Sequence, residues 1–213
     1  MDSKEMAPGD IERKSFEIIA AELGDRTFPP LEAPIVKRVI HTTADFSFAD
    51  SLVFAHDAAA RALDALRAGA TVLTDTNMAL AGVSKPALAK LGCTAVCYMA
   101  DPDIAAAAKA SGTTRAVASM DKACSIEGPL VIAVGNAPTA LLRLCELMDA
   151  GKIAPAAVIG VPVGFVNVVE AKEELLSRDV PAIVARGRKG GSTVAAAIMN
   201  ALLYQLTRPG GPK

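Results

Sequence analysis

Five short, continuously apolar runs constrain this chain more than any other feature of its sequence. They cover residues 71–74, 94–98, 130–134, 157–161 and 181–185. Strands with one wet face alternate apolar and polar residues, whereas strands covered on both faces are apolar throughout. Helical patterns lie between the runs, at residues 57–68, 86–91, 102–110, 138–150, 167–176 and 192–206. This alternation implies right-handed crossovers. It predicts an α/β fold, a mainly parallel sheet with helices on both faces.

The first 45 residues have a different, helical pattern. Asp10 is placed to cap a helix over residues 11–23, and residues 31–40 form a second predicted helix with Pro34 in its first turn. The chain contains no long linker or internal repeat. We therefore expect one α/β domain over residues 1–213, with residues 1–45 as a helical N-terminal extension and residues 208–213 as a frayed tail.

Composition excludes several classes of protein. The 213 residues carry a formal net charge of −1, and 4% are aromatic, which argues against nucleic-acid partners that need a basic field or stacking platforms. No apolar run approaches membrane-spanning length, so we expect a cytoplasmic protein without a membrane partner. The four cysteines form no C-x-x-C pair, and no histidine lies at zinc-ligand spacing from them. We expect reduced, buried thiols that act as small hydrophobic residues, no metal site and no cofactor.

Polar and glycine-rich segments follow the predicted strands. Ligands of open parallel sheets bind beyond the carboxyl ends of the strands. The segments at that edge are residues 75–77, which include Asn77, residues 135–139, residues 160–164 and residues 186–192. They predict a concave rim rich in amides and cations.

Two histidines are present. His41 follows the second predicted helix and precedes Thr42 and Thr43, and its imidazole is the natural proton donor or acceptor near neutral pH. The alternative is a histidine that only caps its helix. His56 precedes Asp57 at the start of another helix, and we interpret it as a cap or surface residue.

The segment Gly-Arg-Lys-Gly-Gly-Ser at residues 187–192, called here the 187–192 loop, resembles a backbone-amide cradle. Its cation Lys189 and its last residue Ser192 suit a carboxylate or phosphate at a helix N-terminus, but an ordinary glycine turn fits equally well. It is not a Walker A loop, because the preceding glycine is missing.

Four other residues have both a functional and a plain interpretation. Asn136 and Thr139 are candidates to face a ligand, but the same turn would also suit a residue that caps the next helix. Arg115 is a candidate to bind a carboxylate, and the alternative is an ordinary surface arginine. Ser15 lies among apolar positions of the first helix, where a serine commonly bonds to its own backbone. No nucleophile, paired-carboxylate or metal constellation emerges.

Five segments in series resemble the precorrin-8X methylmutase family, also called precorrin isomerase. They are residues 38–46 (RVIHTTADF), 74–78 (TDTNM), 135–141 (GNAPTAL), 160–166 (GVPVGFV) and 187–192 (GRKGGS). The resemblance covers about residues 11 to 206, and Thr42 and Thr43 resemble the cobalt-precorrin-8 branch more closely.

The resemblance implies a homodimeric isomerase of cobalamin biosynthesis. Such an enzyme moves a methyl group from ring carbon 11 to ring carbon 12 of a tetrapyrrole by a proton-assisted 1,5-sigmatropic shift, giving hydrogenobyrinate or cobyrinate. His41 becomes the expected catalytic residue. The expected substrate contacts are Ser15, Thr43, Asn77, Arg115, Asn136, Thr139, Lys189 and Ser192.

Two other functions remain open from the residues alone. The rim also suits a tetrapyrrole carrier without catalytic activity. The 187–192 loop also suits a nucleotide-binding α/β enzyme.

Overall fold

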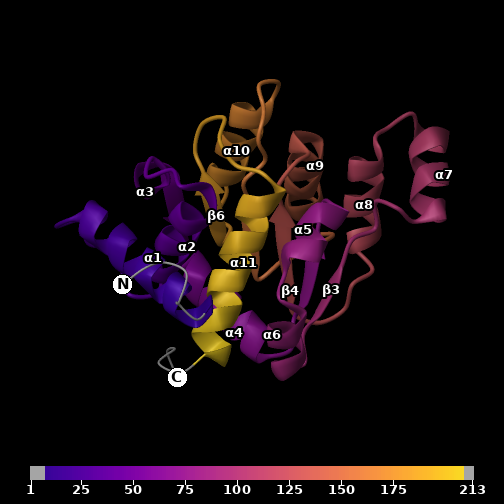
Figure 1. Cartoon of the computed structure of the whole chain (residues 1–213). Coiled ribbons are helices and arrows are strands. Elements are labelled where there is room, and N and C mark those ends of the chain that lie inside the picture. The colour runs from indigo at the N-terminus through magenta and orange to yellow at the C-terminus, as the bar shows by residue number, and fades with distance from the viewer. Residues whose placement is uncertain (1–7, 209–213) are drawn as a thin grey trace.

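A six-stranded sheet forms the centre of the protein (Figure 1). The structure, a computed structural model, describes residues 8–208. The strands are β1 (Leu52–Ala55), β2 (Thr71–Thr74), β3 (Thr94–Val96), β4 (Leu130–Val134), β5 (Ala157–Gly160) and β6 (Ala182–Ala185), in the order β1-β6-β5-β4-β2-β3. All neighbours pair in parallel except β1, which runs antiparallel to β6. The predicted α/β fold class is confirmed, and each of the five apolar runs contains a strand.

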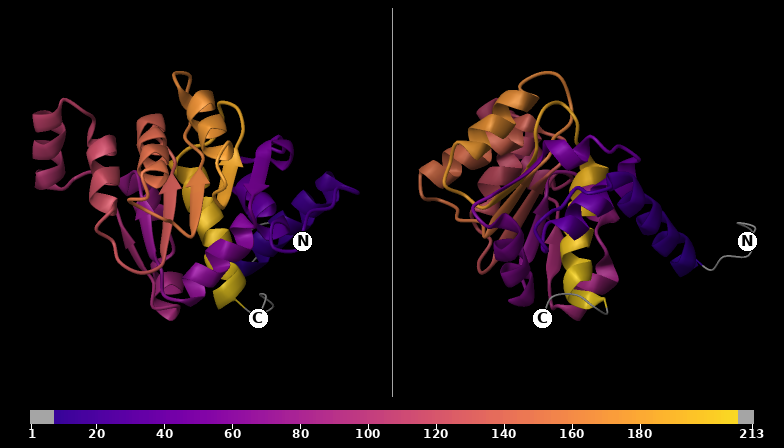
Figure 2. Two further views of the ribbon diagram at one scale, coloured as in Figure 1. Left: turned by 180° about the vertical axis from the view of Figure 1, so that it is seen from behind. Right: turned by 90° about the vertical axis from the view of Figure 1, so that its left-hand side faces the viewer.

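Helices cover both faces of this sheet (Figure 2). On one face lie α1 (Pro8–Leu23), α2 (Ala33–Thr43), α4 (Ala58–Arg67), α5 (Asn77–Gly82), α6 (Lys85–Lys90) and the central α11 (Ser192–Thr207). The other face carries α8 (Arg115–Ala123), α9 (Pro138–Asp149) and α10 (Val168–Leu176), with α7 (Pro102–Ser111) packed outside α8. The short α3 (Phe48–Ser51) leads into β1.

The alternation of side chains along β4 shows why continuous apolar runs were needed. Val131 and Ala133 join the core beneath α11, while Ile132 and Val134 join the core beneath α9 and α10. Side chains of a strand point alternately to the two faces, so each face of a doubly covered strand needs apolar residues.

The sequence analysis missed four elements, which are the strand β1 and the helices α3, α5 and α8. Strand β1 is a short edge strand whose four residues are only partly buried, so its periodic signal is weak. Helices α5 and α8 begin at Asn77 and Arg115, within segments that we interpreted only as polar. In both helices a threonine, Thr76 or Thr114, accepts a hydrogen bond from the backbone N–H three residues on.

Smaller expectations also need correction. Asp10 does not cap α1, because the helix begins at Pro8 and Asp10 lies in its first turn. The second helix runs to Thr43 rather than to residue 40 and contains His41 in its last turn. Of the expected frayed tail, residues 209–213 lie outside the described residues, and Arg208 forms an ion pair with Glu12.

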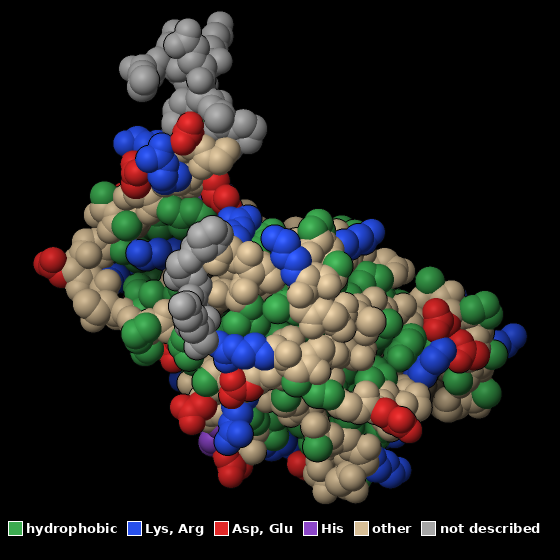
Figure 3. Space-filling model, turned by 90° about the horizontal axis from the view of Figure 1, so that it is seen from below, with side chains coloured by type: hydrophobic (Ala, Val, Ile, Leu, Met, Phe, Trp, Pro, Cys, Tyr) green, Lys and Arg blue, Asp and Glu red, His purple; other side chains and the backbone are tan. Residues whose placement is uncertain are grey.

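The surface and the cysteines complete the description. On the face seen in Figure 3, Lys and Arg side chains are interspersed with Asp and Glu side chains. None of the helices within residues 8–208 combines the length and apolarity needed to cross a membrane. All four cysteines are free, and Cys93 and Cys145 are buried as expected. The expected burial is wrong for Cys97 and Cys124, which are partly exposed.

Candidate functional site

The strand order places a topological switch point between β2 and β4. From β2 the chain passes outward to β3 and then returns to β4 on the other side of β2. The crossovers therefore leave in opposite directions, and the carboxyl ends of β2 and β4 frame the usual ligand position of such a sheet. The predicted ligand edge thus coincides with this switch point.

Asp75 occupies the switch point and is almost fully buried. Its carboxylate accepts hydrogen bonds of 2.8 Å from the backbone N–H groups of Gly135, Asn136 and Ala137. Burial raises the pKa of Asp75, and the three amides partly counteract this effect. The Asp75 side chain, which follows β2, therefore fixes the backbone of the turn that follows β4.

The N-terminus of α11 packs into the same place. Ser192 Oγ lies 2.8 Å from Thr76 Oγ1, which connects the end of β2 to the 187–192 loop. A Cβ atom on Gly135 would lie 2.7 Å from the Cα atom of Ser192, so only glycine permits this approach. Three of the predicted polar segments therefore meet at one edge.

The antiparallel strand β1 brings a fourth segment to this edge. Leu52, where β1 begins, pairs with Ala185, where β6 ends, so the residues before β1 lie beside those after β6. There Lys189 Nζ donates to Asp45 Oδ2 at 2.6 Å and to Ser47 Oγ at 2.9 Å. The bond from Lys189, assisted by Ser47, lowers the pKa of Asp45 to about 2. Lys189 is thus paired with a carboxylate of the protein in this structure.

His41 lies in the last turn of α2, four residues before Asp45. The helix ends at Thr43 and is capped by Ala44, which adopts the left-handed conformation (φ 53°) and donates its N–H to the carbonyl of Ile40. This turn directs the chain toward Asp45 and the 187–192 loop. The half-buried imidazole therefore lies at the end of α2, next to the segment that leads to the 187–192 loop.

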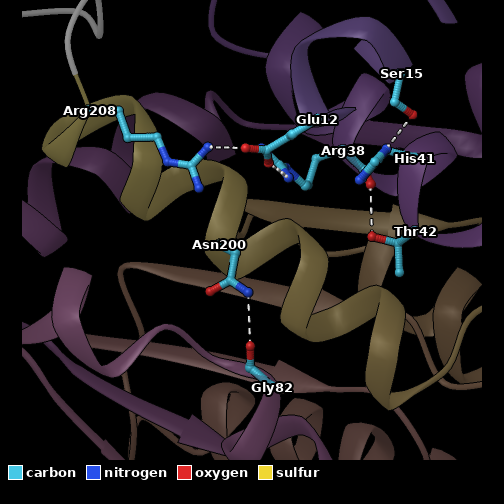
Figure 4. A network of polar contacts seen from close by, with 8 residues as sticks. All are labelled: Glu12, Ser15, Arg38, His41, Thr42, Gly82, Asn200 and Arg208. Carbon is cyan, nitrogen blue, oxygen red and sulfur yellow. Dashed lines mark hydrogen bonds and ion pairs between the residues drawn. The ribbon is translucent and has the colours of Figure 1, made fainter. Parts of the chain in front are cut away.

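Two residues of α1 hold the His41 ring. Ser15 Oγ lies 2.9 Å from His41 Nδ1, and the Phe16 ring stacks on the imidazole at 5.0 Å between centroids and 24° between planes (Figure 4 for the Ser15 contact). In a neutral ring protonated at Nε2, Nδ1 accepts a hydrogen bond from the Ser15 hydroxyl. In an imidazolium, the Nδ1–H group donates a hydrogen bond to Ser15 Oγ. The same partner therefore serves both protonation states.

A charged stack also contacts Phe16. The Arg38 guanidinium lies 4.6 Å from the Phe16 ring centroid and 5.2 Å from that of Tyr204. Glu12 accepts hydrogen bonds from Arg38 at 2.6 Å and from Arg208 at 3.0 Å (Figure 4). Burial alone would raise the pKa of Glu12, but the hydrogen bonds and charges of Arg38 and Arg208 lower it overall. This stack ties α1 to α2 and to the end of α11.

A groove of about 250 Å³ runs beside this stack. It is lined by Arg38, Thr42, Met78, Gly82, Thr193, Ala196, Ala197, Asn200 and Tyr204. Asn200 Nδ2 donates to the carbonyl of Gly82 at 2.8 Å across it (Figure 4). The segment after His41, the start of α5 and the start of α11 therefore share one concave surface.

The other predicted residues divide into two groups. Thr43 lies next to His41, but its hydroxyl bonds to the carbonyl of Val39, and Asn77 is exposed at the start of α5. Asn136 is exposed at the switch point. Arg115 and Thr139 lie on the side of α8 and α9, where Thr139 Oγ1 is 3.5 Å from Thr114 Oγ1. Within residues 8–208, no hydrogen bond connects this last pair to the His41 cluster.

His56 lies at the opposite edge of the sheet. It follows the end of β1, which pairs with the start of β6, and its Nδ1 is 2.8 Å from a carboxylate oxygen of Asp179. The interpretation of His56 as a surface residue agrees with this position. Only His41 lies at the carboxyl ends of the parallel strands.

Our sequence analysis missed several residues that shape the site. Phe16, Arg38 and Glu12 act through contacts between separate helices, which leave no local pattern. Lys172 did carry a signal, because it occupies an apolar phase of α10 together with Val168 and Leu175. Its side chain is fully buried, and burial lowers its pKa to about 8.

This arrangement supports proton transfer and anion binding. It offers one imidazole with a hydrogen-bonded partner, one lysine at a glycine-rich loop, and exposed amide and hydroxyl groups at the switch point. Within the part of the chain that the structure describes, no three His, Cys, Asp or Glu side chains gather as a metal-binding group. The chemistry that these groups allow is proton transfer to or from a bound anion.

Comparison with known protein families gives one consistent result. A family model described as precorrin-8X methylmutase matches residues 10–205. Cobalt-precorrin-8 methylmutase from Salmonella typhimurium is 47% identical over 205 residues, covering 93% of this chain and 96% of that protein. The protein of the same name from Priestia megaterium is 46% identical over 195 residues, covering 92% of this chain and 87% of that protein.

Two further relatives carry the other form of the name. Precorrin-8X methylmutase from Pseudomonas aeruginosa is 40% identical over 195 residues, covering 90% of this chain and 93% of that protein. A solved precorrin-8X methylmutase from Thermus thermophilus superimposes with a TM-score of 0.87 at 42% identity, covering 96% of this chain and 98% of the other. The region matched by the family model contains Ser15, His41, Asp75 and the 187–192 loop, whereas Arg208 lies three residues beyond its end.

Proposed function

The chain belongs to the precorrin-8X methylmutase family, and on that premise we propose how its residues catalyse the methyl migration. The protein is an isomerase of cobalamin biosynthesis that moves a methyl group from ring carbon 11 to ring carbon 12 of its tetrapyrrole. The bond from carbon 11 to the methyl group breaks as the bond to carbon 12 forms. Because the rearrangement is internal, it needs no redox partner and no covalent nucleophile.

We propose that His41 is the acid of this reaction. As an imidazolium it donates a proton to a ring nitrogen of the substrate, which withdraws electron density from the conjugated system and eases the shift. The proton returns to His41 once the methyl group has moved. A positioned general acid typically contributes ~10²–10⁴-fold.

The observation that carries this proposal is the contact between Ser15 and His41. A protonated imidazole directs one N–H to Ser15 Oγ, 2.9 Å away, and leaves the proton on Nε2 for the substrate. Stacking on Phe16 holds the ring plane. The histidine is thereby oriented before the ligand arrives.

We propose that the remaining rim residues bind the carboxylates of the macrocycle. Lys189 and Ser192 lie on the 187–192 loop, Asn136 and Asn77 at the switch point, and Thr43 beside His41. Arg115 and Thr139 lie farther along the same edge and suit a peripheral carboxylate of a large substrate. Because Lys189 pairs with Asp45 at 2.6 Å, a substrate carboxylate at Lys189 must compete with that contact.

The choice between the two substrate forms can be made by experiment. We propose the cobalt-containing form, because the two relatives at 46–47% identity are named cobalt-precorrin-8 methylmutase. Turnover of both forms should be followed by visible absorption, with cobalt-precorrin-8 expected to give the higher kcat/KM. A higher kcat/KM with the metal-free form would contradict this assignment.

The decisive test of the acid is His41→Ala, with His56→Ala as the matched control. His41→Ala should retain product binding and lose most turnover, by about 10²–10⁴-fold. His56→Ala, at the opposite edge of the sheet, should leave kcat within about twofold. Full turnover by His41→Ala would remove His41 from the mechanism.

A non-catalytic tetrapyrrole carrier would use the same rim. It would bind the product tightly while leaving the substrate spectrum unchanged, and the same absorption experiment distinguishes it. A nucleotide-binding enzyme would instead show saturable ATP or NAD binding at the 187–192 loop in a thermal-shift assay.

We further infer that the chain works as one domain in a cytoplasmic homodimer. Exposed apolar side chains at Ile11 and Ile18 on α1, and at Phe165 and Val166 after β5, favour a second copy as their partner. The four free thiols suit a reducing compartment. Light scattering of the purified protein should give the mass of two chains.

A further inference from the structure

Lys172 is the one lysine among the fully buried side chains of residues 8–208, and it lies directly beneath the 187–192 loop. Its Nζ donates two hydrogen bonds of 2.8 Å, one to the carbonyl of Gly187 and one to the carbonyl of Lys189. Burying an ammonium group costs free energy of folding unless a negative charge lies close to it.

Several charged side chains on α10, on the 187–192 loop and on α9 contact groups other than Lys172, while Glu170 on α10 is exposed to solvent. Glu173 pairs with Arg186, and Lys189 pairs with Asp45. Arg188 lies over the Phe165 ring at 5.5 Å, and on the adjoining α9 Asp149 pairs with Arg178. Burial is the cause of the lowered Lys172 pKa, with no contribution from a neighbouring carboxylate among the described residues. The ammonium therefore uses two of its three N–H donors and has no ion-pair partner among the described residues.

The two hydrogen bonds also determine which way the loop amides face. The described part of the chain contains no cis peptide bond, and in a trans peptide the C=O of one residue and the N–H of the next point in opposite directions. Since the carbonyls of Gly187 and Lys189 point inward to Lys172, the N–H groups of Arg188 and Gly190 point away from it. Within residues 8–208, neither N–H group has a backbone acceptor.

Two backbone hydrogen bonds hold other parts of this loop: the Gly164 N–H donates to the carbonyl of Arg188 at 3.1 Å, and the Gly191 N–H donates to the carbonyl of Val161 at 2.8 Å. Gly187, Gly190 and Gly191 have φ of 79°, 156° and 128°, which glycine adopts readily and other residues do not. A Cβ atom on Gly190 would collide with the carbonyl oxygen of Val161. Glycine permits this backbone path but does not enforce it, so the enforcing contacts must come from outside the loop.

We propose that Lys172 is a positioning residue for substrate binding: it turns the amides of the 187–192 loop outward, and its charge is balanced by a substrate carboxylate bound to those amides. This inference rests on the proposed function, in which the macrocycle presents carboxylates to this loop. Anions are bound well by convergent backbone N–H groups with a fixed positive charge behind them. Lys172 itself does not touch the substrate.

The test is Lys172→Met, which keeps the length and apolar stem while removing the ammonium. Lys152→Met is the matched control, because Lys152 is exposed and precedes β5 at the opposite edge of the sheet. Lys172→Met should raise KM and the Kd for the corrinoid product by at least about tenfold and leave kcat within about threefold, as expected for lost uniform binding. A purely structural role would lower the amount of folded protein and leave KM and Kd unchanged, and that result would overturn the proposal.

The two proposals can fail separately. If the wild-type enzyme shows no turnover, the proposed function fails, while titration of the product by visible absorption still compares the Kd of Lys172→Met with that of the wild type.

If Lys172→Met does not fold, NMR of lysine-labelled wild-type protein gives the test. The pKa of Lys172 should rise by at least about one unit when the product is bound, because an anion then faces the ammonium. An unchanged pKa with product bound would overturn the proposal.

Discussion

Ser15 in α1 and His41 in α2 are joined by a 2.9 Å contact between Oγ and Nδ1, although 26 residues separate them in the chain. Neither helix alone determines this contact, because α1 packs on α2 through Phe16 and the Glu12–Arg38 ion pair. The orientation of the proposed acid therefore depends on how the N-terminal helices dock. The first two predictions concern this docking.

Ser15→Ala should lower kcat by about tenfold and shift the alkaline limb of the pH–rate profile to lower pH. The reason is that the imidazolium form of His41 loses the acceptor for its Nδ1 proton. Ser111→Ala, which removes a hydroxyl bonded only to its own helix, is the control and should behave as wild type. A pH–rate profile of Ser15→Ala that overlays the wild-type profile would contradict the proposed role.

Glu12→Gln should reduce the free energy of unfolding by about 1–3 kcal/mol, because Arg38 and Arg208 both lose their carboxylate partner. Turnover should fall by less than tenfold as the support of His41 loosens. Glu17→Gln on the same helix removes only an exposed ion pair with Lys14, so it should change stability by less than about 0.5 kcal/mol. Urea unfolding of both variants measures the difference, and equal stabilities would refute the importance of the stack.

Asp75→Asn should destabilise the protein by about 2–3 kcal/mol. The buried carboxylate accepts three backbone N–H groups, and an asparagine would present its own N–H₂ to at least one of these donors. Asp64→Asn is the control, because Asp64 is exposed and pairs with Arg67 three residues away. If Asp75→Asn unfolds at the same urea concentration as wild type, Asp75 does not hold the turn of residues 135–137.

Asp45→Asn should change how stability depends on acid. The pKa of Asp45 in the folded protein, about 2, lies below its ordinary value of 3.8, so its contribution is complete above pH 4 and is lost as pH falls toward 2. Asp45→Asn lacks this contribution, so the wild type should lose more stability than the variant over that interval. At neutral pH the difference should stay below about 1 kcal/mol, because the pair with Lys189 is partly exposed. Parallel thermal melts from pH 5 to pH 2 check this.

Lys172→Met should change the alkaline side of the stability profile. The pKa of Lys172 in the folded protein, about 8, lies below the 10.5 of an unfolded chain, so the unfolded state binds more protons between these values. Wild-type stability should therefore rise relative to the variant as pH increases from 8 to 10.5, by ~1–3 kcal/mol. Denaturant unfolding at several pH values gives the comparison. Parallel curves for the two proteins would mean that Lys172 is solvated.

The sequence predicted the layers of the fold because that information is local. Each face of a doubly covered strand needs its own apolar residues, so β4 (Leu130–Val134) could be recognised within five positions. The ligand edge followed from the polar segments after the strands, since the carboxyl ends of parallel strands meet at one edge. The strand β1 escaped detection because a short, half-buried edge strand has no comparable pattern.

The α/β fold class, the ligand edge and the candidate histidine could all be predicted from local sequence patterns. The side chains that meet at this edge could not, because they come from distant segments: the antiparallel direction of β1 brings Asp45 to Lys189 across 144 residues, and α11 brings Ser192 to Thr76 across 116. Tertiary packing also buries the lysine of α10 beneath the loop. The physical reason is that periodicity records how a residue faces its own helix or strand, whereas contacts between distant segments depend on how whole elements pack.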